Sequence, residues 1–238
     1  YEVVRTICEE GDEVLISTPC WVSYAEQVKL AGASPVFIET KEENNFKPTL
    51  EEVQKTYNPK VKVFIFNNPN NPTGSVFTER ELKEITTFLI NKGVYLVTDE
   101  VYEHLIYEGR KHISVASLGE REKEMSVTIN SLSKTYAMTG WRVGYVAGPQ
   151  DIVQEAVNLQ GHVTGNINSV AQKVAIAALN GTQEPVQEMI LEYARKRKYM
   201  VDRLNQIKGI HCQYPDGAFY AFSNVTELYG KEYEGKII

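Results

Sequence analysis

The chain has 238 residues, of which 42% are hydrophobic and 24% are charged, and its formal net charge is -6. This composition is typical of a globular protein with a sizeable core, and it argues against long disordered tails. The acidic balance also argues against a nucleic-acid partner, because a nucleic-acid surface usually carries a basic patch.

The cysteines indicate the cellular setting. Cys8, Cys20 and Cys212 are scattered and form no CxxC pair, which is typical of a protein kept in the reducing cytoplasm. The sequence shows neither a signal peptide nor an apolar run of membrane-spanning length, so we expect no membrane partner. The chain opens on a helical pattern and stops at EGKII without a closing element, so we expect an internal fragment of a longer protein.

Short apolar runs alternate with helical stretches up to Pro149. The runs suit strands buried on both faces of a sheet, and they lie at residues 13–17, 35–39, 61–66, 94–102, 126–130 and 142–149. The helices between them are expected at residues 23–30, 50–57 and 79–92. Two of these helices begin with the Thr-x-x-Glu spacing of a capping box, at Thr49 and Thr78.

This alternation predicts an α/β fold with a largely parallel, mixed sheet and helices on both faces. Ligands of such sheets bind beyond the carboxyl ends of the strands. Trp21, Asn71, Asp99 and Lys134 lie at or just after the ends of expected strands. We therefore expect these four side chains to converge on one pocket.

Beyond Pro149 the pattern becomes helical, with helices expected at residues 151–162, 168–181 and 185–207, and residues 209–222 then return to strand and turn. We expect a large first domain over residues 1–184, incomplete at its start. Residues 185–238 would hold a connecting helix and the start of a smaller α+β domain, incomplete at its end. The basic cluster of Arg195, Arg197 and Lys198 is expected to be a solvated helix face.

The most informative stretch is SLSKTYAMTGWRVGY, residues 131–145, where Lys134 follows an expected strand in what we predict to be a loop. Three interpretations of this lysine are open. It is a solvated surface residue, or it binds phosphate together with Ser131, Ser133 and Arg142, or it forms a Schiff base with a carbonyl cofactor.

Four other side chains have ordinary explanations when each is taken alone. Asp99 could cap a helix or form a structural ion pair, Tyr102 and Trp21 could be packed aromatics, and Asn71 could stabilise its turn. Taken together, they meet the needs of pyridoxal phosphate. That cofactor requires a lysine, an ionised acid at its ring nitrogen, donors to its phenolate oxygen, a flat partner and cations at its phosphate. No metal site is indicated.

The motifs NNPNNPTG, TDEVYE and SLSKTYAMTGWRVGY, at these spacings, resemble the class I aminotransferases, which are fold type I pyridoxal phosphate enzymes. The resemblance covers nearly all of the chain. The segment from residue 18 to residue 48 is most similar to bacterial aspartate aminotransferases.

The resemblance implies a role for each matching residue. Lys134 would be the Schiff-base residue and the proton carrier, and Asp99 would pair with the ring nitrogen. Tyr102 and Asn71 would donate to the phenolate oxygen. The remaining contacts would come from Trp21, which stacks on the ring, and from the phosphate ligands Arg142, Ser131 and Ser133.

The resemblance also implies transamination between an amino acid and a 2-oxo acid, with aspartate and 2-oxoglutarate as the leading pair. Alternatives are an aromatic, prephenate or methionine aminotransferase, a carbon-sulfur lyase on the same fold, and a non-enzymatic cofactor-binding regulatory domain. A homodimer is implied, with Thr164 and Asn166 as contributors near the subunit boundary.

Two further parts of the family's site would fall outside this sequence: a glycine-containing phosphate loop before it and a carboxylate-binding arginine after it. We therefore expect weak cofactor binding and little transamination from residues 1–238 alone.

Overall fold

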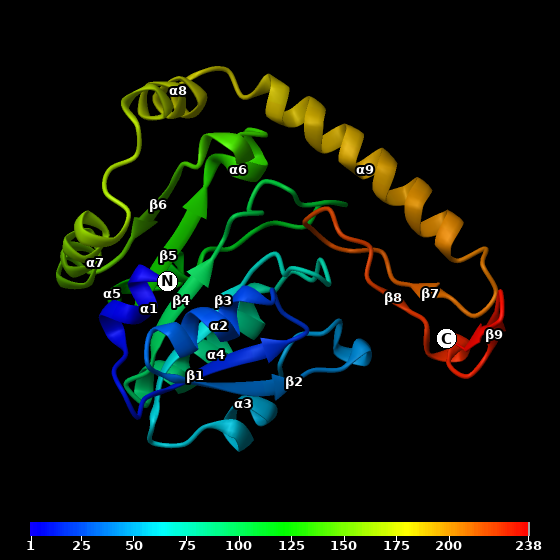
Figure 1. The fold of residues 1–238 in the computed structure, drawn as a ribbon, viewed down its shortest axis with the longest axis horizontal. Helices are drawn as coiled ribbons and strands as arrows, with labels where there is room; N and C mark the ends of the chain where they lie inside the picture. Colours follow the sequence, from blue (N-terminus) through cyan, green and yellow to red (C-terminus); the bar gives the residue numbers. More distant parts are fainter. Residues whose placement is uncertain (238) are drawn as a thin grey trace.

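A six-stranded sheet organises residues 1–237, the part of the chain that the computed structural model describes (Figure 1). Its order is β2-β1-β3-β4-β5-β6. The strands are β1 (Glu13–Thr18), β2 (Ser34–Glu39), β3 (Val61–Asn67), β4 (Tyr95–Asp99), β5 (Ser126–Ser131) and β6 (Gly144–Ala147). Neighbouring strands are parallel except β5 and β6, which are antiparallel. The predicted mixed, largely parallel sheet is confirmed.

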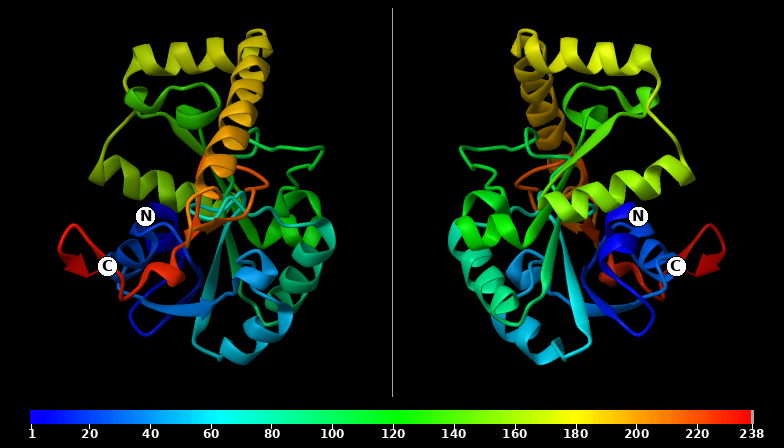
Figure 2. Two further views of the ribbon diagram at one scale, coloured as in Figure 1. Left: turned by 90° about the vertical axis from the view of Figure 1, so that its right-hand side faces the viewer. Right: turned by 90° about the vertical axis from the view of Figure 1, so that its left-hand side faces the viewer.

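Helices cover both faces of this sheet (Figure 2). One face packs against α1 (Glu2–Ile7), α2 (Ser23–Leu30) and α7 (Gln150–Val163), and the other against α3 (Leu50–Thr56) and α4 (Glu79–Asn91). Strand residues alternate between the two layers, because successive side chains of a strand point to opposite faces. In β1, for example, Ile16 joins the first layer and Leu15 the second.

Both predicted capping boxes are present. The Thr49 side chain accepts the Glu52 N–H at 3.2 Å, and the Glu52 carboxylate accepts the Thr49 N–H at 2.8 Å. Thr78 and Glu81 make the same exchange at the start of α4. Since these bonds satisfy backbone donors that the helix leaves free, they fix where α3 and α4 begin.

The remaining elements are short, apart from two helices that follow α7. The helices are α5 (Glu120–Glu124), α6 (Leu132–Thr135), α8 (Ser169–Asn180) and α9 (Glu184–Leu204), and the 3-10 turns are η1 (Glu42–Asn44), η2 (Val115–Ser117), η3 (Thr139–Trp141) and η4 (Thr226–Leu228). Two small antiparallel pairs join β7 (His211–Cys212) to β8 (Ser223–Asn224) and β9 (Glu232–Tyr233) to β10 (Lys236–Ile237). Ile238, the last residue of the expected second domain, lies outside the described residues.

The long helix α9 carries one correction. The side chain of Arg197 is 6% exposed, so the prediction of a solvated face is wrong at this residue. Its guanidinium donates to the Pro215 carbonyl at 2.6 Å and lies 5.2 Å from the ring centre of Tyr107 and 4.9 Å from that of Tyr214. Despite the 21 residues of α9, no helix within residues 1–237 is both long and apolar enough to cross a membrane.

Candidate active site

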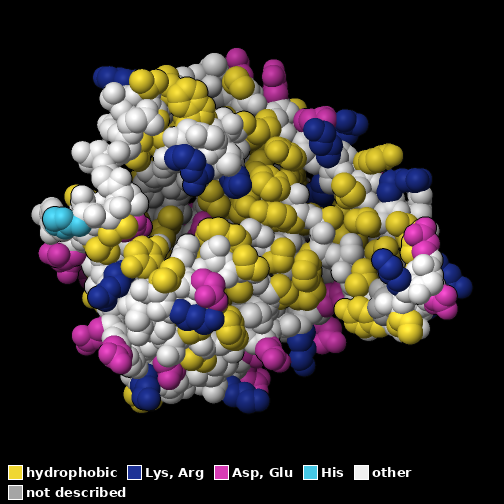
Figure 3. All heavy atoms as spheres, viewed as in Figure 1, with side chains coloured by type: hydrophobic (Ala, Val, Ile, Leu, Met, Phe, Trp, Pro, Cys, Tyr) yellow, Lys and Arg dark blue, Asp and Glu magenta, His cyan; other side chains and the backbone are white. Residues whose placement is uncertain are grey.

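A cavity of about 630 Å³ opens at the carboxyl end of the sheet. Figure 3 shows a hollow on this face, beside α6 and β6, with hydrophobic and basic side chains around it. All eight side chains singled out in the sequence line this cavity: Trp21, Asn71, Asp99, Tyr102, Ser131, Ser133, Lys134 and Arg142. A volume of this size falls in the range of small-molecule sites.

Lys134 lies on the one-turn helix α6, which follows β5 directly, so the prediction of a loop is wrong here. The helix forms because the Ser131 hydroxyl accepts the Ser133 N–H at 3.2 Å and caps the turn. The Lys134 ammonium lies 5.4 Å from the ring centre of Phe219 and 6.0 Å from that of Tyr102. Among residues 1–237 it has no ion-pair partner, and it lines the cavity.

Asp99 ends β4, which stops there rather than at residue 102 as expected. One carboxylate oxygen, Oδ2, accepts the Tyr24 hydroxyl at 2.6 Å, and Oδ1 accepts the Val101 N–H at 3.3 Å. Burial raises the pKa of Asp99, while the Tyr24 and Val101 hydrogen bonds and the positive charge of Lys134 act in the opposite direction.

Tyr24 was not predicted as a site residue. It comes from α2, is 5% exposed, and its ring packs edge-on against Trp21 with the ring centres 5.4 Å apart. Burial, followed by the nearby charge of Asp99, raises the pKa of Tyr24 well above its usual value. The hydroxyl is therefore protonated at neutral pH and donates to the carboxylate.

Asn67 is a second residue that was missed, and it links the ends of two strands. Its amide group donates to the Asp99 carbonyl at 3.1 Å, and its amide oxygen accepts the Asn71 N–H at 2.7 Å. The loop that carries Asn71 then passes beneath a later segment of the chain. At Gly74, φ is +70°, and a Cβ there would lie 2.3 Å from the Pro215 Cβ, so only glycine fits.

That later segment brings Tyr220 to the cavity, which was also not predicted. The Gly217 N–H donates to the Gly74 carbonyl at 2.8 Å, and the hydroxyls of Tyr220 and Tyr102 are hydrogen-bonded to each other. Burial, and then the bond to Tyr220, raise the pKa of Tyr102. Tyr102 is therefore a neutral phenol at neutral pH, and its hydroxyl is able to donate a hydrogen bond.

The three remaining residues supply donors of the kind that phosphate prefers. Ser131 and Ser133 flank the start of α6, and Arg142 lies just before β6 with its guanidinium donating to the Thr139 carbonyl at 2.9 Å. Gly144 lets β6 approach β5 closely, because a Cβ there would lie 2.8 Å from the Asn130 carbonyl. Hydroxyls and a forked guanidinium match phosphate oxygens.

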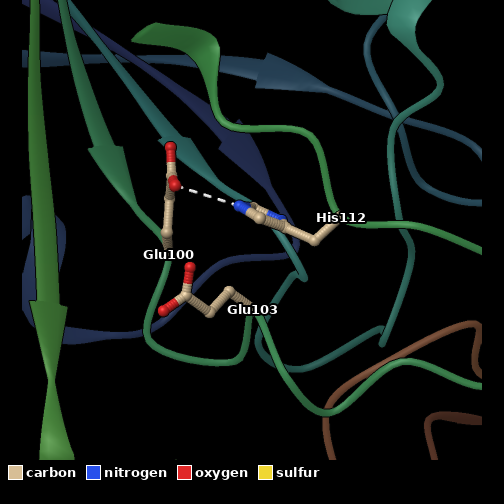
Figure 4. A group of neighbouring side chains, drawn as sticks. All are labelled: Glu100, Glu103 and His112. Atoms are coloured by element: carbon tan, nitrogen blue, oxygen red, sulfur yellow. Dashed lines mark hydrogen bonds and ion pairs between the residues drawn. The ribbon is translucent and has the colours of Figure 1, made fainter. Parts of the chain in front are cut away.

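A second polar group comes from the segment that follows Asp99 in the chain. It is formed by Glu100, Glu103 and His112, each of which has a side-chain oxygen or nitrogen within 4.8 Å of the others (Figure 4). Glu100 is paired with His112 at 2.9 Å and also accepts the Ser114 hydroxyl at 2.9 Å. Glu103 accepts the Asn130 amide at 2.7 Å. Both carboxylates thus have protein donors, and the group ties the segment after β4 to β5 and to the loop around His112.

The comparisons with known proteins assign the family. A family model described as aminotransferase class I and II matches residues 2–234. The chain belongs to this family. It is 47% identical over 227 residues to an aspartate aminotransferase of Geobacillus stearothermophilus, and 43% identical over 230 residues to a probable aspartate/prephenate aminotransferase of Rhizobium leguminosarum.

Solved structures agree with this aminotransferase assignment. The fold superposes on an aspartate aminotransferase from Rhizobium meliloti with a TM-score of 0.96 at 33% identity. An aromatic aminotransferase from Pyrococcus horikoshii gives a TM-score of 0.90 at 41% identity over 93% of this chain and 60% of its own. Matches cover 95% of this chain but only 58% of the Geobacillus relative, in agreement with the expectation of a fragment.

Proposed function

We propose that this aminotransferase chain binds pyridoxal 5'-phosphate at the cavity and uses Lys134 to move an amino group between an amino acid and a 2-oxo acid. One observation carries the proposal: a lysine amine and a partly buried carboxylate line the same cavity, together with two hydroxyls and a guanidinium. This donor set fits the cofactor, whose aldehyde, ring nitrogen and phosphate need an amine, an anion and hydrogen-bond donors respectively.

Each residue would hold one part of the cofactor. Lys134 would bind its aldehyde carbon and Asp99 its ring nitrogen. Asn71 and Tyr102 would donate to the ring oxygen, and Trp21 would cover the ring face. The phosphate would lie against Arg142, Ser131 and Ser133.

The cofactor, when bound, would supply an electron sink for the bonds at the substrate α-carbon. The Lys134 amine, once released by the incoming amino group, would carry the proton between the α-carbon and the cofactor carbon. Tyr102 would remain protonated, because burial raises its pKa, and would donate a hydrogen bond rather than accept a proton. The ionised form of Asp99 would keep the ring nitrogen protonated.

For the substrates we propose aspartate as amino donor and 2-oxoglutarate as acceptor, supported by the relatives named aspartate aminotransferase. Prephenate is the second candidate acceptor, because several relatives carry the name aspartate/prephenate aminotransferase. Formation of glutamate or of the prephenate-derived amino acid, measured with aspartate as sole donor, separates the two. Release of pyruvate without any oxo acid would favour a lyase instead.

Three further proposals concern the whole protein. We propose a cytoplasmic location, on the cysteine usage, and a division between two domains near residue 184. We also propose a homodimer, supported by exposed apolar side chains on α7 and α8 such as Val157, Val163 and Ile176. Light scattering at several concentrations tests the dimer, and a monomer throughout would contradict it.

Covalent trapping tests the cofactor proposal even if binding is weak. Incubation with pyridoxal phosphate and reduction with borohydride should fix one cofactor on the peptide that contains Lys134. Lys134→Ala should lose this adduct, whereas Lys173→Ala, which removes an exposed lysine on α8, should keep it. Labelling spread over surface lysines, unchanged in Lys134→Ala, would contradict the proposal.

A further inference from the structure

We propose that Tyr24 is a positioning residue: its hydroxyl fixes the Asp99 side chain in one orientation on the cavity wall and favours its ionised form. The role in cofactor binding rests on the function proposed above. The contact between the two residues does not, since it is a property of the protein alone.

The geometry shows how firmly the pair is held. Tyr24 is 5% exposed and belongs to the core layer that α2 forms with the sheet, so its ring has little freedom to move. Trp21 packs edge-on against the same ring. The hydroxyl then reaches Oδ2 of Asp99 at 2.6 Å, a length typical of an O–H donor to a carboxylate.

The charges around Asp99 explain why this one donor matters. Burial disfavours the carboxylate anion, and the neighbouring charge of Glu100 adds to that effect. The Val101 N–H and the positive charge of Lys134 oppose it, but Tyr24 is the side chain that donates a hydrogen bond to Asp99 within the described residues, and its contribution is the largest of the opposing ones. Without it, the proton would be lost from Asp99 at a higher pH.

The chain offers a matched control at Tyr107. This phenol is also buried, at 4% exposure, and also donates a hydrogen bond at 2.6 Å, but its acceptor is the Ala218 carbonyl. Phenylalanine at either position removes one hydroxyl from a buried ring. Effects shared by the two variants are therefore structural, whereas effects confined to Tyr24→Phe act through Asp99.

The first experiment titrates the cofactor-free chain by NMR with ¹³C-labelled aspartate carboxyls, with the Asp99 signal assigned by its loss in Asp99→Asn. Tyr24→Phe should move the Asp99 midpoint upward by about one pH unit, the equivalent of a hydrogen bond to a charged group. Tyr107→Phe should leave it unchanged. An unchanged midpoint in Tyr24→Phe would overturn the proposal.

A second measurement uses the unmodified chain and does not depend on the folding of a variant. With ¹³Cζ-labelled tyrosine, the Tyr24 signal should shift with the same midpoint as Asp99, because its hydroxyl loses an anionic acceptor there. If the chemical shift of Tyr24 did not change as Asp99 ionises, the proposal would also be overturned.

Measuring cofactor affinity distinguishes the proposed role of Tyr24 from the proposed function of the chain. The affinity of Tyr24→Phe for pyridoxal phosphate should fall on acidification at a pH about one unit higher than in the unmodified chain, following the Asp99 midpoint. If the unmodified chain fails to take up pyridoxal phosphate on Lys134, the proposed function is wrong, and the two NMR titrations still decide the role of Tyr24.

Discussion

Asp99 places a negative charge where burial disfavours it, so this carboxylate destabilises the folded chain while the cavity is free. Its pKa is raised by folding, which means that the folded state retains a proton that the unfolded state has already lost. Stability therefore falls as the pH rises from the ordinary aspartate value through the raised one. Asparagine has the same size but no charge, so Asp99→Asn should remove this loss.

Urea unfolding of the cofactor-free chain at a series of pH values checks the expectation. Asp99→Asn should be more stable than the unmodified chain at neutral pH, and the difference should vanish below the ordinary aspartate pKa. A gain that is the same at every pH would mean that packing, rather than charge, distinguishes the two side chains. If the proposed function holds, the same variant should also bind pyridoxal phosphate more weakly, and the charge that destabilises the fold would then serve cofactor binding.

Residues of the cavity could be predicted from the sequence where the side chain is reactive or charged and lies in a distinctive motif. Lys134, Asp99 and Arg142 stand in unusual motifs, and the structure brings them to one cavity. Tyr24 and Tyr220 gave no such signal, because tyrosine is an ordinary core residue. Their partners also lie 75 and 118 positions away in the sequence, where no local pattern can connect them.

Among the elements, α4 shows how a local signal and a distant contact reinforce each other. The Thr78 hydroxyl accepts the Glu81 N–H at 3.3 Å, and Glu81 in turn binds the largely buried ammonium of Lys47 at 2.6 Å. Thr78→Ala should lower the free energy of unfolding by roughly 1–2 kcal/mol, since it frees a helix donor and loosens the residue that pairs with Lys47.

Thr49→Ala is the matched control for this prediction. It removes the same box from α3, and the bonds of both boxes are exposed, but Glu52 forms no ion pair within residues 1–237, whereas Glu81 pairs with Lys47. Its cost should be about 0.5–1 kcal/mol, toward the lower end for a lost cap. Equal costs in urea unfolding would show that the contact with Lys47 adds nothing to the cap at α4.

Most element boundaries followed from such local signals. Two that did not are fixed by local hydrogen bonds that the apolar pattern does not show. After Asp99 the chain turns and the Glu103 N–H bonds the Glu100 carbonyl at 2.9 Å, whereas the helical turn at Lys134 is capped by Ser131. Residues 209–222 were expected as strand and turn, but only β7 in this segment is a regular strand. Its middle forms a single bridge from Gly217 to Ile106 and packs on the loop at Gly74.

At the scale of the whole molecule, the segment that follows α9 returns to the cavity, although α8 and α9 lead the chain away from it. Figure 1 shows α9 extending from α8 to the region of β7 and β8, and the segment between those two strands then runs back toward the sheet. That segment brings Tyr220 to the cavity lining, where it is hydrogen-bonded to Tyr102, and places the Phe219 ring 5.4 Å from the Lys134 ammonium. The position of α9 therefore affects the site, although α9 itself contributes none of the residues that line the cavity.

Arg197 joins α9 to this returning segment, and its replacement is the sharpest test of that link. The guanidinium donates to the Pro215 carbonyl and lies over two tyrosine rings, Tyr107 and Tyr214, which a planar, forked cation suits. Lysine keeps the charge but cannot reproduce the stacking together with the directed bond. Arg197→Lys should therefore lower the free energy of unfolding by about 2 kcal/mol.

The exposed ion pair of Arg197 provides the control. Its bond to Glu108 is 2.7 Å long, yet the Glu108 side chain is 71% exposed, and water and salt weaken such a pair. Glu108→Gln should therefore leave urea unfolding almost unchanged. If Glu108→Gln were as costly as Arg197→Lys, the ion pair, rather than the carbonyl and the two rings, would hold α9 to the segment that reaches the cavity.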